Sequence, residues 1–352
     1  MPNRKSAEHR VYASFRTRAC TAGLCVGAQI FLSGCAVGMP LALSSAWLAS
    51  LLSLPFACYL TLKSRRILMH CRHTAPVHRA RCALLFLALL ASAAFALSSV
   101  SVFAAQTLVQ EARTLLIHAT ALCAAALCAL SGGTGAARLC FALRFILPVL
   151  VLGLSVWAVP LRVPVGLFPI LGAGAVPLGA AALSMLFGAA PALMLALPPP
   201  ELHDVDPQNI PNARFFIGRV LCGAVCGVLL LFLTSACTTY ESIAESGEWG
   251  ARLRMAAGNQ PHEGVFQMLL TLGKLLSMLL LGVHMLCSAQ QALHLAIPGL
   301  RTEAGLLICI VLIAVCLLAA LVFGDAPLLF GAPLIALPAA VAAALPARRH
   351  RT

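Results

Sequence analysis

The chain has 352 residues, of which 61% are hydrophobic and 10% are charged, and its mean hydropathy is +0.95. These values exclude a soluble domain with a surface of ordinary polarity and predict an all-α membrane protein that crosses the bilayer several times. The net charge of +13 would also suit a nucleic-acid-binding protein, so the positions of the basic residues have to decide between the two.

Apolar runs long enough to cross a bilayer fill most of the sequence, since a core of about 30 Å needs about 20 residues of helix. We predict about ten spans within a transmembrane domain of residues 19–346, between basic tails at 1–18 and 347–352. The predicted spans cover residues 19–39, 44–62, 83–106, 114–131, 139–159, 168–198, 216–238, 264–290, 304–323 and 326–346.

Most of the 24 Lys and Arg residues fall in the tails and loops of one predicted side, which the positive-inside rule assigns to the cytoplasm. The opposite side has only Arg113, Arg162, Arg252 and Arg254, and Lys274 lies within a span. Membrane topology therefore accounts for the basic charge and supports an even number of spans. We expect contact with the lipid bilayer, no nucleic-acid partner, and both termini in the cytoplasm.

The first span is interrupted by glycines and closed by a proline, in Gly27-Ala-Gln-Ile-Phe-Leu-Ser-Gly-Cys-Ala-Val-Gly-Met-Pro40. Glycine weakens a helix locally, and backbone groups that are freed in lipid must find a partner in protein or in water. Such a segment indicates either a broken helix at a binding site or a helix that packs closely against a neighbour. Leu32-Ser33-Gly34-Cys35 also resembles a lipoprotein cleavage box, but the sequence after Cys35 is apolar where a lipoprotein has a polar tether.

Neither the cysteines nor the acidic loop predicts a metal site. The 15 cysteines are scattered singly through the spans, without a CxxC pair or histidines at metal-ligand spacing, and are typical of small packing residues. The loop with Glu201, His203, Asp204 and Asp206 is predicted to be solvated, because no further ligand spacing accompanies it. We expect no cofactor and no metal.

The sixth span is long and contains Pro169, Pro177 and Pro191 before it ends at Pro198. Proline removes a helical hydrogen bond and clashes with the preceding turn, so a straight helix is excluded. We predict two half-helices that meet near residues 184–188.

The eighth span contains Lys274 near its middle, whereas Arg144 and Arg219 lie close to the cytoplasmic ends of their spans. A lysine at this depth costs roughly 2.5–3.5 kcal/mol, which favours a functional position over a side chain that reaches the interface or pairs structurally. Spacings of three, four and seven place the polar residues of this span on one helical stripe that should face protein or water. The stripe consists of Gln267, Thr271, Lys274, Ser277, His284, Ser288 and Gln291.

The interrupted spans one and six are five helices apart. Secondary transporters built from two inverted repeats have this layout, with the binding site near the midplane. The repeats would cover about 19–159 and 168–346. Gly27-x-x-Ile30-x-x-x-Gly34 with Pro40 resembles the first helix of amino-acid/polyamine/organocation permeases, and the block from Phe145-Ile-Leu-Pro148 through 167–174 to Pro198 is similar to the permease subunit of bacterial endospore germinant receptors.

The resemblance implies a leucine-transporter-like 5+5 fold whose unwound parts of helices 1 and 6 bind an amino acid or a similar small solute. It also implies a cation site between spans one and eight, for which Lys274, Ser277 and His284 are the coupling candidates. By position, the residues implied to contact the solute are Gly27, Ala28, Gln29, Ser33, Gly34, Ser184, Phe187 and Gly188.

We therefore expect a permease or a permease-like receptor in the inner membrane of a bacterium. Broken helices expose N–H groups and carbonyls that suit the carboxylate and the ammonium of a zwitterion. The alternative is a non-transporting assembly or scaffold subunit that acts with partner membrane or lipoprotein subunits. An enzyme is not expected, because paired acids, a His-Glu-x-x-His motif and a suitable serine constellation are absent from the sequence.

Overall fold

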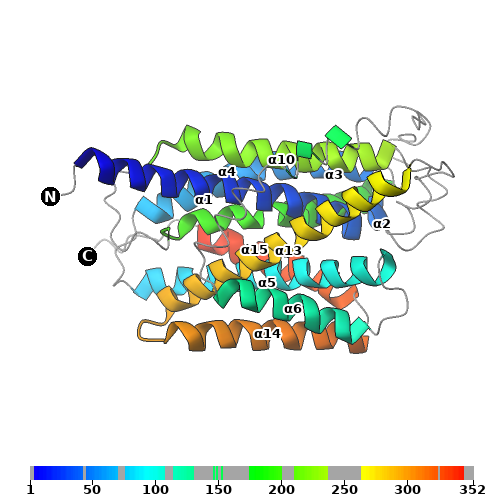
Figure 1. The fold of residues 1–352 in the computed structure, drawn as a ribbon. Helices are drawn as coiled ribbons and strands as arrows, with labels where there is room; N and C mark the ends of the chain where they lie inside the picture. Colours follow the sequence, from blue (N-terminus) through cyan, green and yellow to red (C-terminus); the bar gives the residue numbers. More distant parts are fainter. Residues whose placement is uncertain are drawn as a thin grey trace.

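The computed structural model shows a bundle of long helices, and among the residues that it describes there is no strand (Figure 1). In the described part of the chain, seven helices are long and apolar enough to cross a membrane, and two shorter apolar helices, Leu115–Leu130 and Gly331–Ala344, accompany them. The predicted fifth span, 139–159, lies outside the described residues apart from isolated positions. The structure describes residues 4–42, 45–69, 76–107, 114–130, 146, 148–149, 152–153, 174–199, 210–236, 263–323 and 326–344.

Most helices coincide with predicted spans, and the two predicted interruptions appear as changes of helix type. The elements are α1 (Arg4–Ser33), the π-helix η1 (Gly34–Gly38), α2 (Met39–Ala42), α3 (Ala46–Ser50), α4 (Ser53–Met69), α5 (Pro76–Thr107), α6 (Thr114–Leu130), α9 (Ala175–Leu186), the 3-10 helix η4 (Phe187–Ala196), α10 (Ala213–Ala236), α13 (Glu263–Ala296), α14 (Thr302–Phe323) and α15 (Ala326–Ala344).

Helices of one repeat pack against helices of the other repeat, as expected for an inverted-repeat fold. Helix α1 packs extensively against α10. In the inverted repeat, η4 corresponds to α1 and α4 corresponds to α10, and η4 and α4 also pack extensively against each other. Helix α5 packs most extensively against α13, its own counterpart five spans later, and Figure 1 shows this pair between the α1, α4 and α10 layer and the α6 and α14 pair. The described helices therefore agree with a 5+5 inverted-repeat fold.

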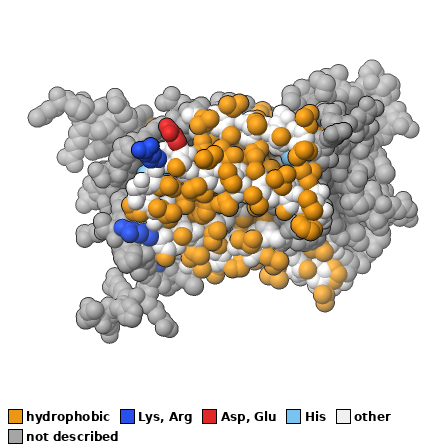
Figure 2. Space-filling view, turned by 90° about the horizontal axis from the view of Figure 1, so that it is seen from below, with side chains coloured by type: hydrophobic (Ala, Val, Ile, Leu, Met, Phe, Trp, Pro, Cys, Tyr) orange, Lys and Arg blue, Asp and Glu red, His pale blue; other side chains and the backbone are white. Residues whose placement is uncertain are grey.

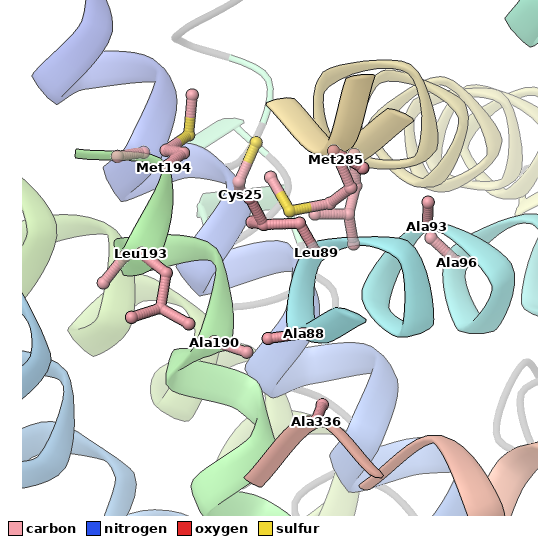
Figure 3. Close-up of a cluster of buried hydrophobic side chains, with 14 of the residues drawn as sticks. Cys25, Ala88, Leu89, Ala93, Ala96, Ala190, Leu193, Met194, Met285 and Ala336 are labelled. Atoms are coloured by element: carbon pink, nitrogen blue, oxygen red, sulfur yellow. The ribbon is translucent and has the colours of Figure 1, made fainter. Parts of the chain in front are cut away.

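The centre of the bundle is a cluster of small and flexible apolar side chains from five elements. Cys25 of α1, Leu89 of α5, Met194 of η4, Met285 of α13 and Ala336 of α15 all belong to it (Figure 3). Lipid tails are as apolar as these side chains, so the packing depends on close van der Waals contact between small residues. This core packs against the side of α1 that faces the centre of the bundle.

Helices α1 and α10 cross at two pairs of glycines, Gly23 with Gly223 and Gly27 with Gly227. A Cβ atom on Gly223 would collide with the carbonyl group of Gly23, and one on Gly227 would collide with that of Gly27. Each helix thus presents a small-x-x-x-small motif that brings the two backbones into contact. At Gly27 the structure shows close packing between helices.

The face formed by α6 and α14 is apolar. Figure 2 shows hydrophobic side chains across the middle of this face, while charged side chains gather at one edge. On α14, Leu307, Val311, Val315 and Val322 are exposed. A broad band of exposed aliphatic side chains is typical of a surface in contact with lipid, so the chain is a multi-pass membrane protein.

Candidate functional site

Two changes of helix type occur where the sequence predicts broken helices. After Ser33, α1 continues into the π-helix η1, and after Leu186, α9 continues into the 3-10 helix η4. Short π segments inside α-helices are frequent at functional sites, and 3-10 runs beyond about four residues are uncommon. The predicted interruption of the sixth span near residues 184–188 is confirmed, and the first span is interrupted by a π-helix rather than an extended break.

The two interruptions lie side by side. A Cβ atom on Gly188 would lie 2.9 Å from the Cα of Ile30, so the backbone of η4 touches α1 directly beside Gln29. One on Gly38 would lie 2.8 Å from the Cε of Met185, so η1 touches α9. The structure thus brings together the two halves of the predicted site.

Gln29 and Ser33 are the polar residues of α1 at this junction. Both are 0% exposed, and the four-residue spacing puts them on one face of the helix. Neither nitrogen Nε2 nor oxygen Oε1 of Gln29, nor Oγ of Ser33, has a hydrogen-bond partner among the described residues. An unpaired buried polar group costs about 1–3 kcal/mol, so this pair is destabilising unless a ligand or water binds to it.

The other predicted residues surround this junction in different ways. Phe187 is buried and meets Phe95 of α5 edge to face, with ring centroids 5.2 Å apart. Gly34 lies beneath the side chain of Leu231 on α10, as Gly27 lies against Gly227. Ala28 is buried, and Ser184 is half-buried on α9. Their contact with a solute stays a prediction.

The polar stripe of α13 faces protein over its second half. Ser277 is half-buried, and His284 and Ser288 are buried. His284 Nε2 has no hydrogen-bond partner in the described part of the chain. Lys274 lies in α13, outside the residues whose side chains the structure describes, so its role in coupling stays a prediction.

Sequence reasoning placed Arg18 in the cytoplasmic tail, whereas the structure places it inside the bundle with 8% exposure. Its Nε and Nη2 donate to the carbonyl oxygen of Met194 at 3.0 and 2.7 Å, and its Nη1 donates to the carbonyl oxygen of Pro198 at 3.0 Å. Nη2 also donates to Oε1 of Gln291 at 3.2 Å. These acceptors explain how a charged side chain is buried at this position.

A comparison of which residues share one face of the first helix could have indicated that Arg18 is buried. It precedes Cys25 by seven residues and Gln29 by eleven, about two and three helical turns, so all three lie on one side of α1. The observed helix also begins at Arg4, well before the predicted start of the first span at residue 19. The first helix therefore extends further toward the N-terminus than the hydrophobic run indicates.

The described residues at the junction of α1 and η4 do not include the ligand set of a metal centre. None of the predicted spans contains Asp or Glu. In the part of the chain that the structure describes, no group of three or more His, Cys, Asp or Glu residues could hold a metal ion.

The chain is similar to solved structures of a manganese transporter from Eremococcus coleocola. One of them, in complex with an aromatic bis-isothiourea substituted compound, has a TM-score of 0.58 at 15% identity and covers 94% of this chain and 78% of its own. Two variants of the same transporter have TM-scores of 0.61 and 0.62, each at 15% identity over 98% of this chain and 80% of theirs. No protein-family model and no curated protein sequence matches the chain. At this identity the likeness shows the fold, which is that of a membrane transporter.

Proposed function

We propose that the chain is a secondary permease, or a permease-like receptor, for an amino acid or a similar small polar solute. The observation that carries the proposal is a pair of buried residues, Gln29 and Ser33, whose polar atoms have no hydrogen-bond partner among the described residues and which lie where the interrupted helices touch. Transporters of inverted-repeat design bind their solute at such a junction. A place among the amino-acid/polyamine/organocation permeases, near the germinant-receptor permease subunits, belongs to the same proposal.

The chemistry of the junction favours a zwitterion over a divalent cation. Hard divalent cations prefer oxygen ligands, with carboxylates prominent among them, and the predicted spans contain no carboxylate. Gln29 offers a donor and an acceptor. The carboxylate of an amino acid would accept hydrogen bonds from Gln29 Nε2 and Ser33 Oγ, and its ammonium would donate to Gln29 Oε1. A metal ion would leave the donor of Gln29 unsatisfied.

The described state is closed around the site. Gln29 and Ser33 have no exposed surface, so a solute enters or leaves only after neighbouring elements move. Proton coupling, where it occurs, would use Lys274 or His284, because they are the titratable side chains of the α13 stripe. We place the protein in the cytoplasmic membrane of a bacterium with both termini inside, in keeping with the bias of its basic loops.

A thermal-shift screen of the purified protein tests this function. We expect an amino acid to raise the melting temperature, because a ligand at about 100 times its Kd adds about 2.7 kcal/mol to the stability of the folded state. Nucleobases, polyamines and manganese(II) serve as competing classes, each measured with and without sodium. A shift produced by manganese(II) alone, and removed by a chelator, would overturn the proposed solute class.

A further inference from the structure

We propose that Arg18 closes one end of the candidate site. Its guanidinium binds a group of oxygen atoms supplied by η4 and α13, which we call the oxygen site, and the candidate site can open toward this end only after the guanidinium leaves. The inference concerns a movement of α1, and its test needs no solute. It rests on the proposed function of the site that Arg18 closes, but the two can fail separately, because the labelling test uses no solute.

The oxygen site lies at the C-terminal end of η4. This helix ends at Ala196, where Leu197 has an extended backbone with φ −96° and ψ 141°, and the carbonyls of its last turn point toward that end. Such carbonyls carry the negative end of the helix dipole, where a cation is stabilised. Met194 supplies one of them, which also accepts the Leu197 N–H at 3.3 Å. Pro198 supplies the carbonyl oxygen two residues beyond the helix end, and Gln291 supplies its side-chain oxygen.

Gln291 also holds the oxygen site in shape. Its Nε2 donates to the Pro198 carbonyl oxygen at 2.6 Å, while its Oε1 accepts from Arg18. The same side chain therefore ties α13 to the end of η4 and to α1. Arg18 thus joins three elements through one planar group with several donors.

The acceptors in these bonds are neutral, which makes the closure reversible. A carboxylate would bind the guanidinium as an ion pair, and removing one partner of a buried ion pair is strongly destabilising. Carbonyl and amide oxygens can instead be exchanged for water or lipid phosphate when the long side chain reaches the interface. The oxygen site is therefore suited to release the arginine during a transport cycle.

The position of Arg18 on α1 links the oxygen site to the candidate site. Cys25 and Gln29 follow on the same side of the helix, and Gly23 and Gly27 hold the other side against α10. Figure 3 shows Cys25 among the side chains of η4, α5 and α13. Cys25 is 2% exposed. Because α1 and α10 are joined by backbone contact, release of Arg18 would let this pair move away from η4 and α13, exposing Cys25 before Gln29.

Native Cys25 supplies the reporter for the test. In a variant that keeps Cys25 and has every other cysteine replaced, we measure labelling by a membrane-impermeant thiol reagent in vesicles that present the Arg-rich side. We expect Arg18→Ala to speed labelling by about tenfold or more, the effect of losing one or two charged hydrogen bonds. Arg16→Ala is the matched control, since Arg16 is exposed and two residues away, and it should label at the parent rate.

Two further arms keep the test decisive. Guanidinium ion at millimolar concentration should slow the labelling of Arg18→Ala, because it can occupy the oxygen site, and should leave the Arg16→Ala rate unchanged. If Arg18→Ala does not fold, Gln291→Ala removes one acceptor and should give an intermediate rate. Folded Arg18→Ala or Gln291→Ala protein that labels at the parent rate would overturn the proposal, as would Arg18→Ala labelling that guanidinium does not slow.

Discussion

Gln29→Leu is expected to weaken solute binding strongly while leaving the protein folded and at least as stable as the parent. Leucine is one methylene shorter than glutamine and lacks the two polar atoms that have no hydrogen-bond partner among the described residues. Removing them relieves a desolvation cost of about 1–3 kcal/mol for each group, and it deletes the donor and the acceptor proposed to bind the solute. Two lost hydrogen bonds of about 0.5–1.5 kcal/mol each weaken binding by roughly 5- to 150-fold.

The combination of a stability gain with a binding loss separates a binding residue from a structural one. Gln290→Leu is the control, because Gln290 lies on the α13 side of the turn to α14 and donates to the Thr302 carbonyl oxygen at 3.0 Å. It should lose a little stability and keep solute binding. Melting temperature and equilibrium binding of the solute identified by the screen are the two measurements. A Gln29→Leu protein that binds normally would remove Gln29 from the site.

Gly223→Ala is expected to be the most destabilising of the small substitutions. The added methyl group would meet the backbone carbonyl of Gly23, which no side-chain rotation can move aside, so α1 and α10 must separate. Overpacking of this kind costs typically about 1–3 kcal/mol. Thermal unfolding in detergent measures the effect.

The matched control is Gly218→Ala on the same helix. A Cβ atom at Gly218 meets nothing within 4 Å, so the substitution adds helix propensity, worth up to about 1 kcal/mol, without a clash. The two variants make the same chemical change, and the difference between their melting temperatures isolates the packing of α1 against α10. Equal melting temperatures would show that the helices do not depend on this close approach.

The interrupted helices could be predicted from sequence because glycine and proline act locally. Three prolines exclude a straight sixth span, and the structure divides it between Leu186 and Phe187, within the predicted segment. The five-helix separation of the two interruptions then predicts that they meet, as the contact of Gly188 with Ile30 shows. The form of each interruption was not predictable, since it depends on neighbours such as Leu231 above Gly34.

Arg18 was misplaced for a different physical reason. A hydropathy pattern penalises arginine wherever it occurs, whereas its burial depends on acceptors that are 176 and 273 residues away in the chain. Likewise, the Gly23–Gly27 and Gly223–Gly227 pairs are visible as motifs, but the sequence does not say which helix each pair meets. Features that depend on contacts between residues far apart in the sequence could therefore be identified only from the structure.

Uptake of the solute by protein reconstituted in liposomes tests the central claim most directly. The account predicts saturable uptake by the parent protein and strongly reduced uptake by Gln29→Leu at a solute concentration near the parent Kd, at equal amounts of inserted protein. Binding without uptake would contradict transport and favour a receptor or an assembly subunit. Equal uptake by the parent and Gln29→Leu would contradict the site at the junction of α1 and η4.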